Sequence, residues 1–126
     1  MLNDHQRILI IDDEEENRFY FSSILSGAGY ECLMAENGTE GHEMYEKERP
    51  AVILLDINMP GISGMVALRK IRATGQSYGL DPKVVMLTAR AEKEFVTEAL
   101  GNGAAGYLLK TVTPEKLVET VKTQLA

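Results

Sequence analysis

Hydrophobic residues fall into five short continuous runs along the chain, separated by longer stretches in which they recur every three or four positions. The runs predict strands over residues 7–13, 30–36, 51–57, 83–89 and 106–110. The segments ILII, AVILL, VVML and YLL lack the polar alternation of a strand that has one face in solvent. They therefore indicate strands buried on both faces, as in a parallel sheet covered by helices.

Residues with helical spacing fill the stretches between these runs. The first helix is marked by apolar residues at positions i, i+3, i+4 and i+7, namely Phe21, Ile24, Leu25 and Ala28. Gly27 and Gly29 are expected to end it. The second helix is the least well defined, because Gly41 lies inside it and an interior glycine costs about 1 kcal/mol relative to alanine.

The later helices are predicted in the same way. An apolar stripe marks the third, residues 92–100 form a short fourth, and Thr113 followed by Pro114 predicts the start of the last. Residues 73–83 are interpreted as a loop, because the alternation of strand and helix resumes after them. This alternation predicts a single α/β domain over residues 1–126, an open doubly wound sheet with right-handed crossovers.

Composition narrows the possible partners. A net charge of -6 disfavours a nucleic-acid-binding surface, which needs clustered lysine and arginine. Cys32 is the only cysteine, so an internal disulfide is impossible and a reducing compartment is favoured. No apolar run is long enough to span a bilayer, and the first residues lack the apolar stretch of a secretory signal. We therefore expect a cytoplasmic protein without membrane association.

Chemically active side chains collect where the predicted strands end. Asp12 and Asp13 end the first strand, Asp56 lies near the end of the third, Thr88 near the end of the fourth, and Lys110 ends the fifth. In doubly wound sheets, ligands bind beyond the carboxyl ends of the strands. Two carboxylates about 4 Å apart repel by roughly 4 kcal/mol at an effective dielectric constant near 20. Three of them in one pocket therefore need a cation or strongly raised pKa values.

The residue types at this edge favour one kind of cation and one kind of chemistry. Only oxygen donors are offered, without histidine or cysteine, so Mg²⁺ or Mn²⁺ is favoured over zinc or copper. The charge of Lys110 and the hydroxyl of Thr88 suit contact with a phosphoryl group. Asp56 is then left as a carboxylate nucleophile that could form an aspartyl phosphate.

The segments IIDDEEENR, LLDINMPGISG, VVMLTAR and GAAGYLLK, in this order, resemble the motifs of bacterial response-regulator receiver domains of the chemotaxis-regulator type. The resemblance covers essentially the whole chain. It implies a flavodoxin-like, five-stranded parallel sheet of order 2-1-3-4-5 with helices on both faces, and Asp56 as the phosphoacceptor. It also implies a magnesium site whose ligands would be Asp12, Asp13, Asp56 and the backbone carbonyl of Asn58.

The same resemblance implies a signalling switch of a two-component phosphorelay, which promotes only its own phosphorylation and dephosphorylation. A histidine kinase or phosphotransfer protein would donate the phosphoryl group, Thr88 and Lys110 would bind its oxygens, and Tyr107 would reorient when Thr88 moves. An output partner would bind the face formed by the fourth helix, fifth strand and fifth helix. Asn58 and Arg90 are candidate modulators of dephosphorylation.

One departure and several alternatives accompany this interpretation. Thr111 follows Lys110 where the family commonly has a proline, often in a cis peptide bond, so a trans bond is expected here. A haloacid-dehalogenase-type phosphatase would need a second acid where Asn58 stands, and a cap domain. A flavodoxin would need a phosphate cradle where the segment DDEEE lies. A receiver-like interaction module that is never phosphorylated stays open.

Overall fold

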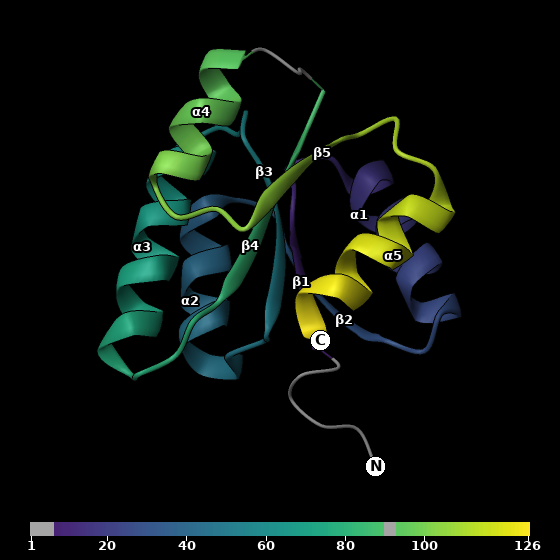
Figure 1. Ribbon diagram of the computed structural model, residues 1–126, viewed down its shortest axis with the longest axis horizontal. Coiled ribbons are helices and arrows are strands. Elements are labelled where there is room, and N and C mark those ends of the chain that lie inside the picture. Colours follow the sequence, from purple (N-terminus) through teal and green to yellow (C-terminus); the bar gives the residue numbers. More distant parts are fainter. Residues whose placement is uncertain (1–6, 90–92) are drawn as a thin grey trace.

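The computed structural model describes residues 7–89 and 93–126, in which strands and helices alternate along the chain (Figure 1). The strands are β1 (Arg7–Ile11), β2 (Glu31–Ala35), β3 (Val52–Asp56), β4 (Lys83–Thr88) and β5 (Gly106–Leu109). The helices are α1 (Glu15–Gly27), α2 (Gly38–Glu48), α3 (Gly64–Ser77), α4 (Lys93–Gly101) and α5 (Pro114–Leu125). None of these helices has both the length and the apolar character that crossing a bilayer requires.

The five strands form one parallel sheet of order β2-β1-β3-β4-β5, which confirms the predicted fold class. Helices α1 and α5 cover one face, and α2, α3 and α4 cover the other (Figure 1). From β1 the chain passes first to β2 on one side and then to β3 on the other. The topological switch point therefore lies between β1 and β3, which is where ligands bind in sheets of this kind.

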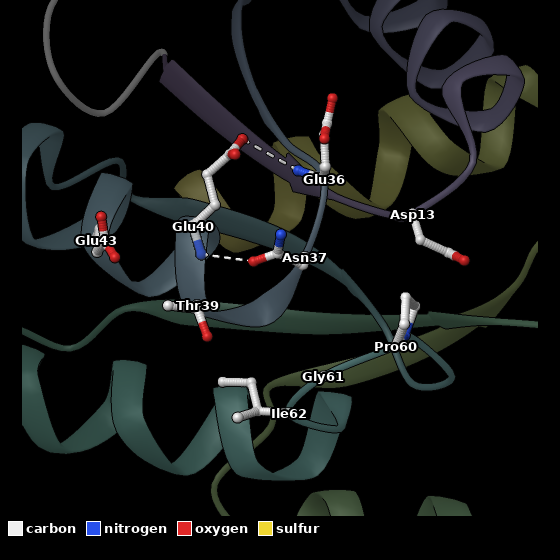
Figure 2. A pocket seen from close by; sticks show the side chains of 9 residues that line it. All are labelled: Asp13, Glu36, Asn37, Thr39, Glu40, Glu43, Pro60, Gly61 and Ile62. Atoms are coloured by element: carbon white, nitrogen blue, oxygen red, sulfur yellow. Dashed lines mark hydrogen bonds between the residues drawn. The ribbon is translucent and has the colours of Figure 1, made fainter.

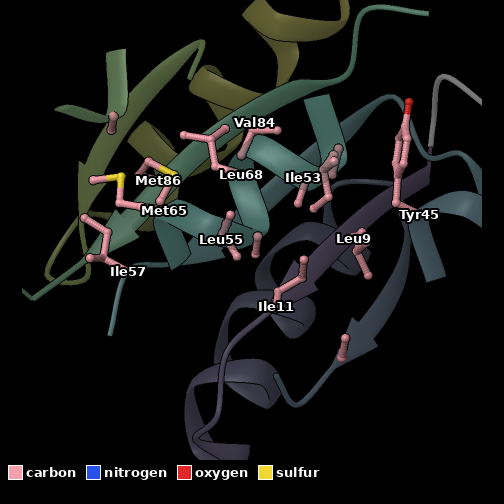
Figure 3. Packing of buried hydrophobic residues seen from close by; sticks show 14 residues of the cluster. Leu9, Ile11, Tyr45, Ile53, Leu55, Ile57, Met65, Leu68, Val84 and Met86 are labelled. Atoms are coloured by element: carbon pink, nitrogen blue, oxygen red, sulfur yellow. The ribbon is translucent and has the colours of Figure 1, made fainter. Parts of the chain in front are cut away.

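Both faces of the sheet are buried, so alternate side chains of each central strand belong to two separate cores. Leu9 and Ile11 belong to the core under α2, α3 and α4, and Ile8 and Ile10 to the core under α1 and α5. Figure 3 shows the first of these cores. Complete burial of a side chain of this size contributes roughly 1.5–3 kcal/mol. This double burial explains the continuous apolar runs of β1, β3 and β4. The prediction was wrong for the run YLL, because β5 is an edge strand in which Tyr107 and Leu109 are exposed.

Two interior glycines allow close packing of the helices. A Cβ atom at Gly41 of α2 would overlap the side chain of Ile11, so the glycine that weakened the prediction of this helix is the one that lets it approach β1. A Cβ atom at Gly75 of α3 would overlap the ring of Pro82. The predicted loop over residues 73–83 was wrong in its first half, because α3 continues through Gly75 to Ser77. The residue types of this stretch are typical of a loop, although it is helical.

The ends of the elements agree with the predictions in part. β1 ends at Ile11, two residues earlier than predicted, so the acids that follow it belong to the loop before α1. The predicted cap of α5 is confirmed, since the Thr113 hydroxyl accepts a hydrogen bond from the backbone N–H of Lys116 at 3.1 Å. Gly29 ends α1 with a φ of 98°, whereas Ala28 is its exposed C-cap residue and does not extend the buried stripe.

Candidate functional site

Four strands deliver the predicted site residues to one edge of the sheet. Asp12 directly follows β1, Asp56 ends β3, Thr88 ends β4, and Lys110 directly follows β5. Parallel pairing of β1 with β3, of β3 with β4, and of β4 with β5 brings these strand ends side by side. The structure therefore assembles at the switch point the residues that the sequence placed there.

The three aspartates form a compact carboxylate cluster. One oxygen from each of Asp12, Asp13 and Asp56 lies within 4.8 Å of the other two. Asp12 and Asp56 are buried, at 1% and 4% exposure, while Asp13 is exposed and open to solvent. An all-oxygen donor set with an open side suits Mg²⁺ or Mn²⁺, which bind few carboxylates and keep water ligands.

Lys110 lies over the two buried carboxylates. Its ammonium nitrogen is 3.0 Å from Oδ2 of Asp12 and 3.2 Å from Oδ2 of Asp56. Burial lowers the pKa of Lys110, but the adjacent Asp12 and Asp56 outweigh this effect, so the pKa is raised and the side chain stays charged. With the three aspartates of the cluster ionised, Lys110 leaves two negative charges uncompensated, which is the charge that a divalent cation would neutralise.

Hydrogen bonds fix the orientation of Asp12 through its Oδ1 and its backbone carbonyl, and leave Oδ2 facing Lys110. Its Oδ1 accepts a hydrogen bond from the backbone N–H of Glu14 at 2.9 Å, and its backbone carbonyl accepts one from the guanidinium of Arg18 at 2.7 Å. Its Oδ2 is buried and accepts no hydrogen bond of normal geometry, although the Lys110 ammonium is close enough for an ion pair. A buried acceptor in this state fits a metal ligand better than a purely structural carboxylate.

Asp56 has an unusual protonation equilibrium. Its pKa is raised to about 6, chiefly by burial. The positive charge of Lys110 and the backbone N–H of Asn58 act against this rise, and the negative charge of Asp12 adds to it. The Asn58 N–H lies 3.3 Å from Oδ1 of Asp56. A cation bound beside this carboxylate would favour the ionised form, which is the form that can act as a nucleophile.

Gly64, which the sequence analysis did not single out, fixes the end of β3. Its backbone N–H donates a hydrogen bond to the carbonyl of Ile57 at 2.9 Å. A Cβ atom there would overlap the backbone oxygen of Asp56 and lie 2.6 Å from the Cα of Ile57. The first residue of α3 therefore rests directly on the strand end that carries Asp56. The same hydrogen bond closes the loop that contains Asn58, which is exposed.

An acidic groove continues from the cluster toward α2. Figure 2 shows its lining residues, which are Asp13, Glu36, Asn37, Thr39, Glu40, Glu43, Pro60, Gly61 and Ile62. Asn37 caps α2 by accepting a hydrogen bond from the Glu40 N–H at 2.8 Å, and Glu40 in turn accepts one from the backbone N–H of Glu36 at 3.2 Å. The groove leaves Asp13 accessible from solvent and lines the approach with negative charge.

The remaining predicted residues lie on the side of β4 and β5. Thr88 is buried at 1% exposure, and Tyr107 is 37% exposed on β5, where it pairs with Met86. No peptide bond in the described part of the chain is cis, so the Lys110 to Thr111 bond is trans, as predicted. Arg90, the other candidate modulator of dephosphorylation, lies outside the described residues.

Comparison with known proteins identifies the family. The doubly wound sheet and its acidic strand-end cluster define a class of α/β signalling domain, and residues 8–122 match the family model described as the response regulator receiver domain. The chain therefore belongs to the response regulator receiver domain family, whose members act as switches in two-component signalling and interact with kinases and output domains. This membership decides against the haloacid dehalogenase and flavodoxin alternatives.

The relatives include both longer regulators and proteins of similar length. The chain is 37% identical over 118 residues to the phosphate regulon transcriptional regulatory protein PhoB of Pseudomonas aeruginosa, and this match covers 94% of the chain and 51% of PhoB. It is 32% identical to protein PilH of the same species over 95% of the chain and 98% of PilH. The structure of the chemotaxis protein CheY4 of Vibrio cholerae matches with a TM-score of 0.86 and 32% identity, over 93% of this chain and 96% of that one. The chain thus spans about half the length of PhoB.

Proposed function

We propose that the chain accepts a phosphoryl group on Asp56 from a histidine kinase or phosphotransfer protein, with Mg²⁺ bound at the strand-end cluster, and thereby switches an output partner. The observation that carries this proposal is the convergence of three carboxylates within 4.8 Å, with the Lys110 ammonium 3.2 Å from the acceptor carboxylate. Residues 1–126 would form a single receiver domain working in the cytoplasm, without direct contact to nucleic acid.

The proposed metal ligands are Asp12, Asp13, Asp56 and the backbone carbonyl of Asn58, and Mn²⁺ would substitute for Mg²⁺. When bound, the metal supplies positive charge next to the acceptor and to the phosphoryl oxygens. The buried Oδ2 of Asp12, which the Lys110 ammonium approaches to 3.0 Å, and the two uncompensated negative charges support this assignment. The exposure of Asp13 also supports the assignment, because a metal ion bound there could keep water ligands on the solvent side.

The chain's own residues would act by position and charge. A carboxylate oxygen of Asp56 attacks phosphorus, the bond from phosphorus to the donor nitrogen breaks, and the departing imidazole keeps the bonding electron pair and takes up a proton. Lys110 would neutralise a phosphoryl oxygen while remaining charged, which its raised pKa favours. The buried hydroxyl of Thr88 would donate to another oxygen. Preorganised charge of this kind supplies most of the catalysis in phosphoryl transfer.

The switch would run from Thr88 to Tyr107. A phosphoryl group offers new acceptor oxygens that can draw the Thr88 hydroxyl inward, and the Tyr107 ring, still 37% exposed, could then turn into the vacated space. The face formed by α4, β5 and α5 already exposes Leu100, Tyr107 and Leu109. An output partner that binds the switched face more tightly would, by linkage, also favour the phosphorylated state.

Intact-mass spectrometry after incubation with acetyl phosphate tests the proposal. One added phosphoryl group is expected with Mg²⁺ and none after chelation. Asp56→Asn should abolish the addition, whereas Asp81→Asn, which changes an exposed aspartate paired with Arg72 and Lys83, should leave it intact. A phosphoryl group retained in Asp56→Asn would refute the site. No addition to the parent protein from either a small donor or a kinase would favour the receiver-like interaction module.

A further inference from the structure

A second pocket lies at the opposite edge of the sheet, where β3 and β4 begin. It is lined by Tyr45, Arg49, Pro50, Ala51, Leu80, Asp81, Pro82, Lys83, Gln124 and Leu125. Most of this surface is apolar, contributed by prolines, leucines and an alanine, with a few polar groups among them. Apolar walls with a small number of placed polar groups are the usual composition of a small-molecule site. Nothing in the proposed phosphoryl chemistry uses this edge.

Tyr45 brings an unpartnered hydroxyl to this pocket. Its side chain is 1% exposed and belongs to the core under α2 and α3, yet its hydroxyl points away from that core (Figure 3). No hydrogen-bond partner for the hydroxyl lies within residues 7–89 and 93–126. Burial raises the pKa of Tyr45, although Arg49 and Arg72 lower it, so the group is a neutral donor. The hydroxyl is not fully buried and lies in the pocket lining, so a ligand or solvent oxygen is expected beside it.

Arg49 occupies the rim in a backbone conformation that glycine adopts more easily. Its φ of 49° and ψ of 53° are left-handed, and it is the only non-glycine residue with positive φ in the described part of the chain. Its guanidinium carbon lies 3.8 Å from the centroid of the Tyr78 ring. Within the described residues, no carboxylate forms an ion pair with it. The guanidinium is thus held over Tyr78 with its terminal nitrogens left for an incoming acceptor.

Donors outnumber free acceptors among the lining side chains. The Asp81 carboxylate is the only one in the lining, and it already pairs with Arg72 and with the Lys83 ammonium, the latter at 2.6 Å. The Nε of Arg49 donates to the backbone carbonyl of Glu46 at 3.4 Å. The terminal guanidinium nitrogens of Arg49 and the Tyr45 hydroxyl are therefore the donors of the lining that a ligand could use. A complementary ligand must bring acceptor oxygens at one end and an apolar body at the other.

We propose that this pocket binds a small amphipathic carboxylic acid, with its carboxylate directed to Arg49 and the Tyr45 hydroxyl, and its apolar body against Leu80, Pro82 and Leu125. The partial negative charge at the carboxyl end of α2 opposes an anion, and the guanidinium offsets it. Comparison of the acid with an uncharged analogue of the same length is therefore the decisive test of the carboxylate's contribution. The site is independent of phosphorylation, because it lies at the amino ends of the strands.

The test is an NMR titration of the ¹⁵N-labelled 126-residue chain with octanoate, 1-octanol and acetate. Octanoate should give saturable shifts confined to the backbone amides of residues 45–51, 80–83 and 124–125. Octanol lacks the carboxylate and acetate lacks the apolar body, so both should bind at least about tenfold more weakly. Binding of either analogue as tight as that of octanoate would overturn the proposal. So would the absence of saturable shifts up to about 10 mM octanoate.

Three variants separate binding from folding. Arg49→Gly removes the guanidinium while placing glycine at a left-handed position, so the folded state should be retained as octanoate affinity falls at least about tenfold. Tyr45→Phe removes only the hydroxyl and should weaken binding severalfold. Arg69→Gln changes an exposed arginine elsewhere and should leave affinity unchanged. Parent-like affinity in Arg49→Gly, with its fold confirmed by its spectrum, would refute the assigned carboxylate site.

Discussion

Replacing Asp56 with asparagine should stabilise the metal-free protein at neutral pH, even though it removes the acceptor. Burial raises the pKa of Asp56 from 3.8 to about 6, so the folded state holds its proton more tightly than the unfolded state does. The stability gained from this group is complete below pH 3.8 and is lost as the pH rises through about 6. Asparagine is neutral at every pH, so the variant does not lose this stability as the pH rises.

The magnitude follows from the same values. A carboxyl group whose pKa rises from 3.8 to about 6 loses roughly 3 kcal/mol of stability across that interval. The raised pKa already includes the attraction of Lys110, so a net gain of up to about 3 kcal/mol is expected above pH 7. In a domain of this size, that gain corresponds to a rise in Tm of roughly 5–10 °C. Near pH 4 the gain should largely vanish.

Chemical or thermal unfolding in the presence of a chelator measures this difference at about pH 4 and about pH 8. Asp81→Asn is the matched control, because hydrogen bonds from Lys83 and Arg72 lower the pKa of Asp81 and its loss should act in the opposite direction. Saturating Mg²⁺ should shrink the advantage of Asp56→Asn by favouring the ionised carboxylate in the folded parent. If Asp56→Asn is more stable than the parent by the same amount at both pH values, or is no more stable at the higher pH, the reasoning is refuted.

Three further predictions concern the metal, the packing of α3 and the output face. Asp13→Asn should weaken Mg²⁺ binding about tenfold or more by calorimetry, because it removes an ionised ligand, whereas Glu16→Gln should not; equal affinities would contradict the assignment. Gly64→Ala should slow phosphorylation and weaken Mg²⁺ binding in the folded protein because its Cβ displaces the end of β3, while Gly27→Ala, with open space around it, should do neither. Beryllofluoride, a phosphoryl mimic, should shift NMR signals in residues 93–126; changes confined to the strand-end loops would count against the output face.

The fold could be predicted from the sequence because the three central strands, β1, β3 and β4, are buried on both faces. Continuous runs such as ILII and VVML leave no polar face, and this pattern already implies a parallel sheet between helix layers. The largest error in the predicted helices occurred where a glycine serves packing rather than a turn. Gly75 gave residues 73–83 a loop-like composition, yet in the structure it lets α3 pass close to Pro82. A contact between residues distant in sequence leaves no local signal.

The candidate site likewise has residues that the sequence could predict and contacts that it could not. Asp12, Asp56 and Lys110 could be predicted because strand ends in a doubly wound sheet share one edge. The supporting contacts could not. Arg18 reaches back to the backbone carbonyl of Asp12 across a helix turn, and Gly64 matters through the atom it lacks. Both effects depend on three-dimensional approach, which neither residue type nor spacing reveals.

Chemical trapping of the acyl phosphate tests the central claim most directly. After phosphorylation with Mg²⁺ and acetyl phosphate, borohydride reduces an aspartyl phosphate to homoserine, and peptide mass spectrometry then locates the modified residue. The account predicts homoserine at Asp56 alone, and none when the metal is chelated. Homoserine at another aspartate, or its formation at Asp56 to the same extent without a divalent cation, would contradict it.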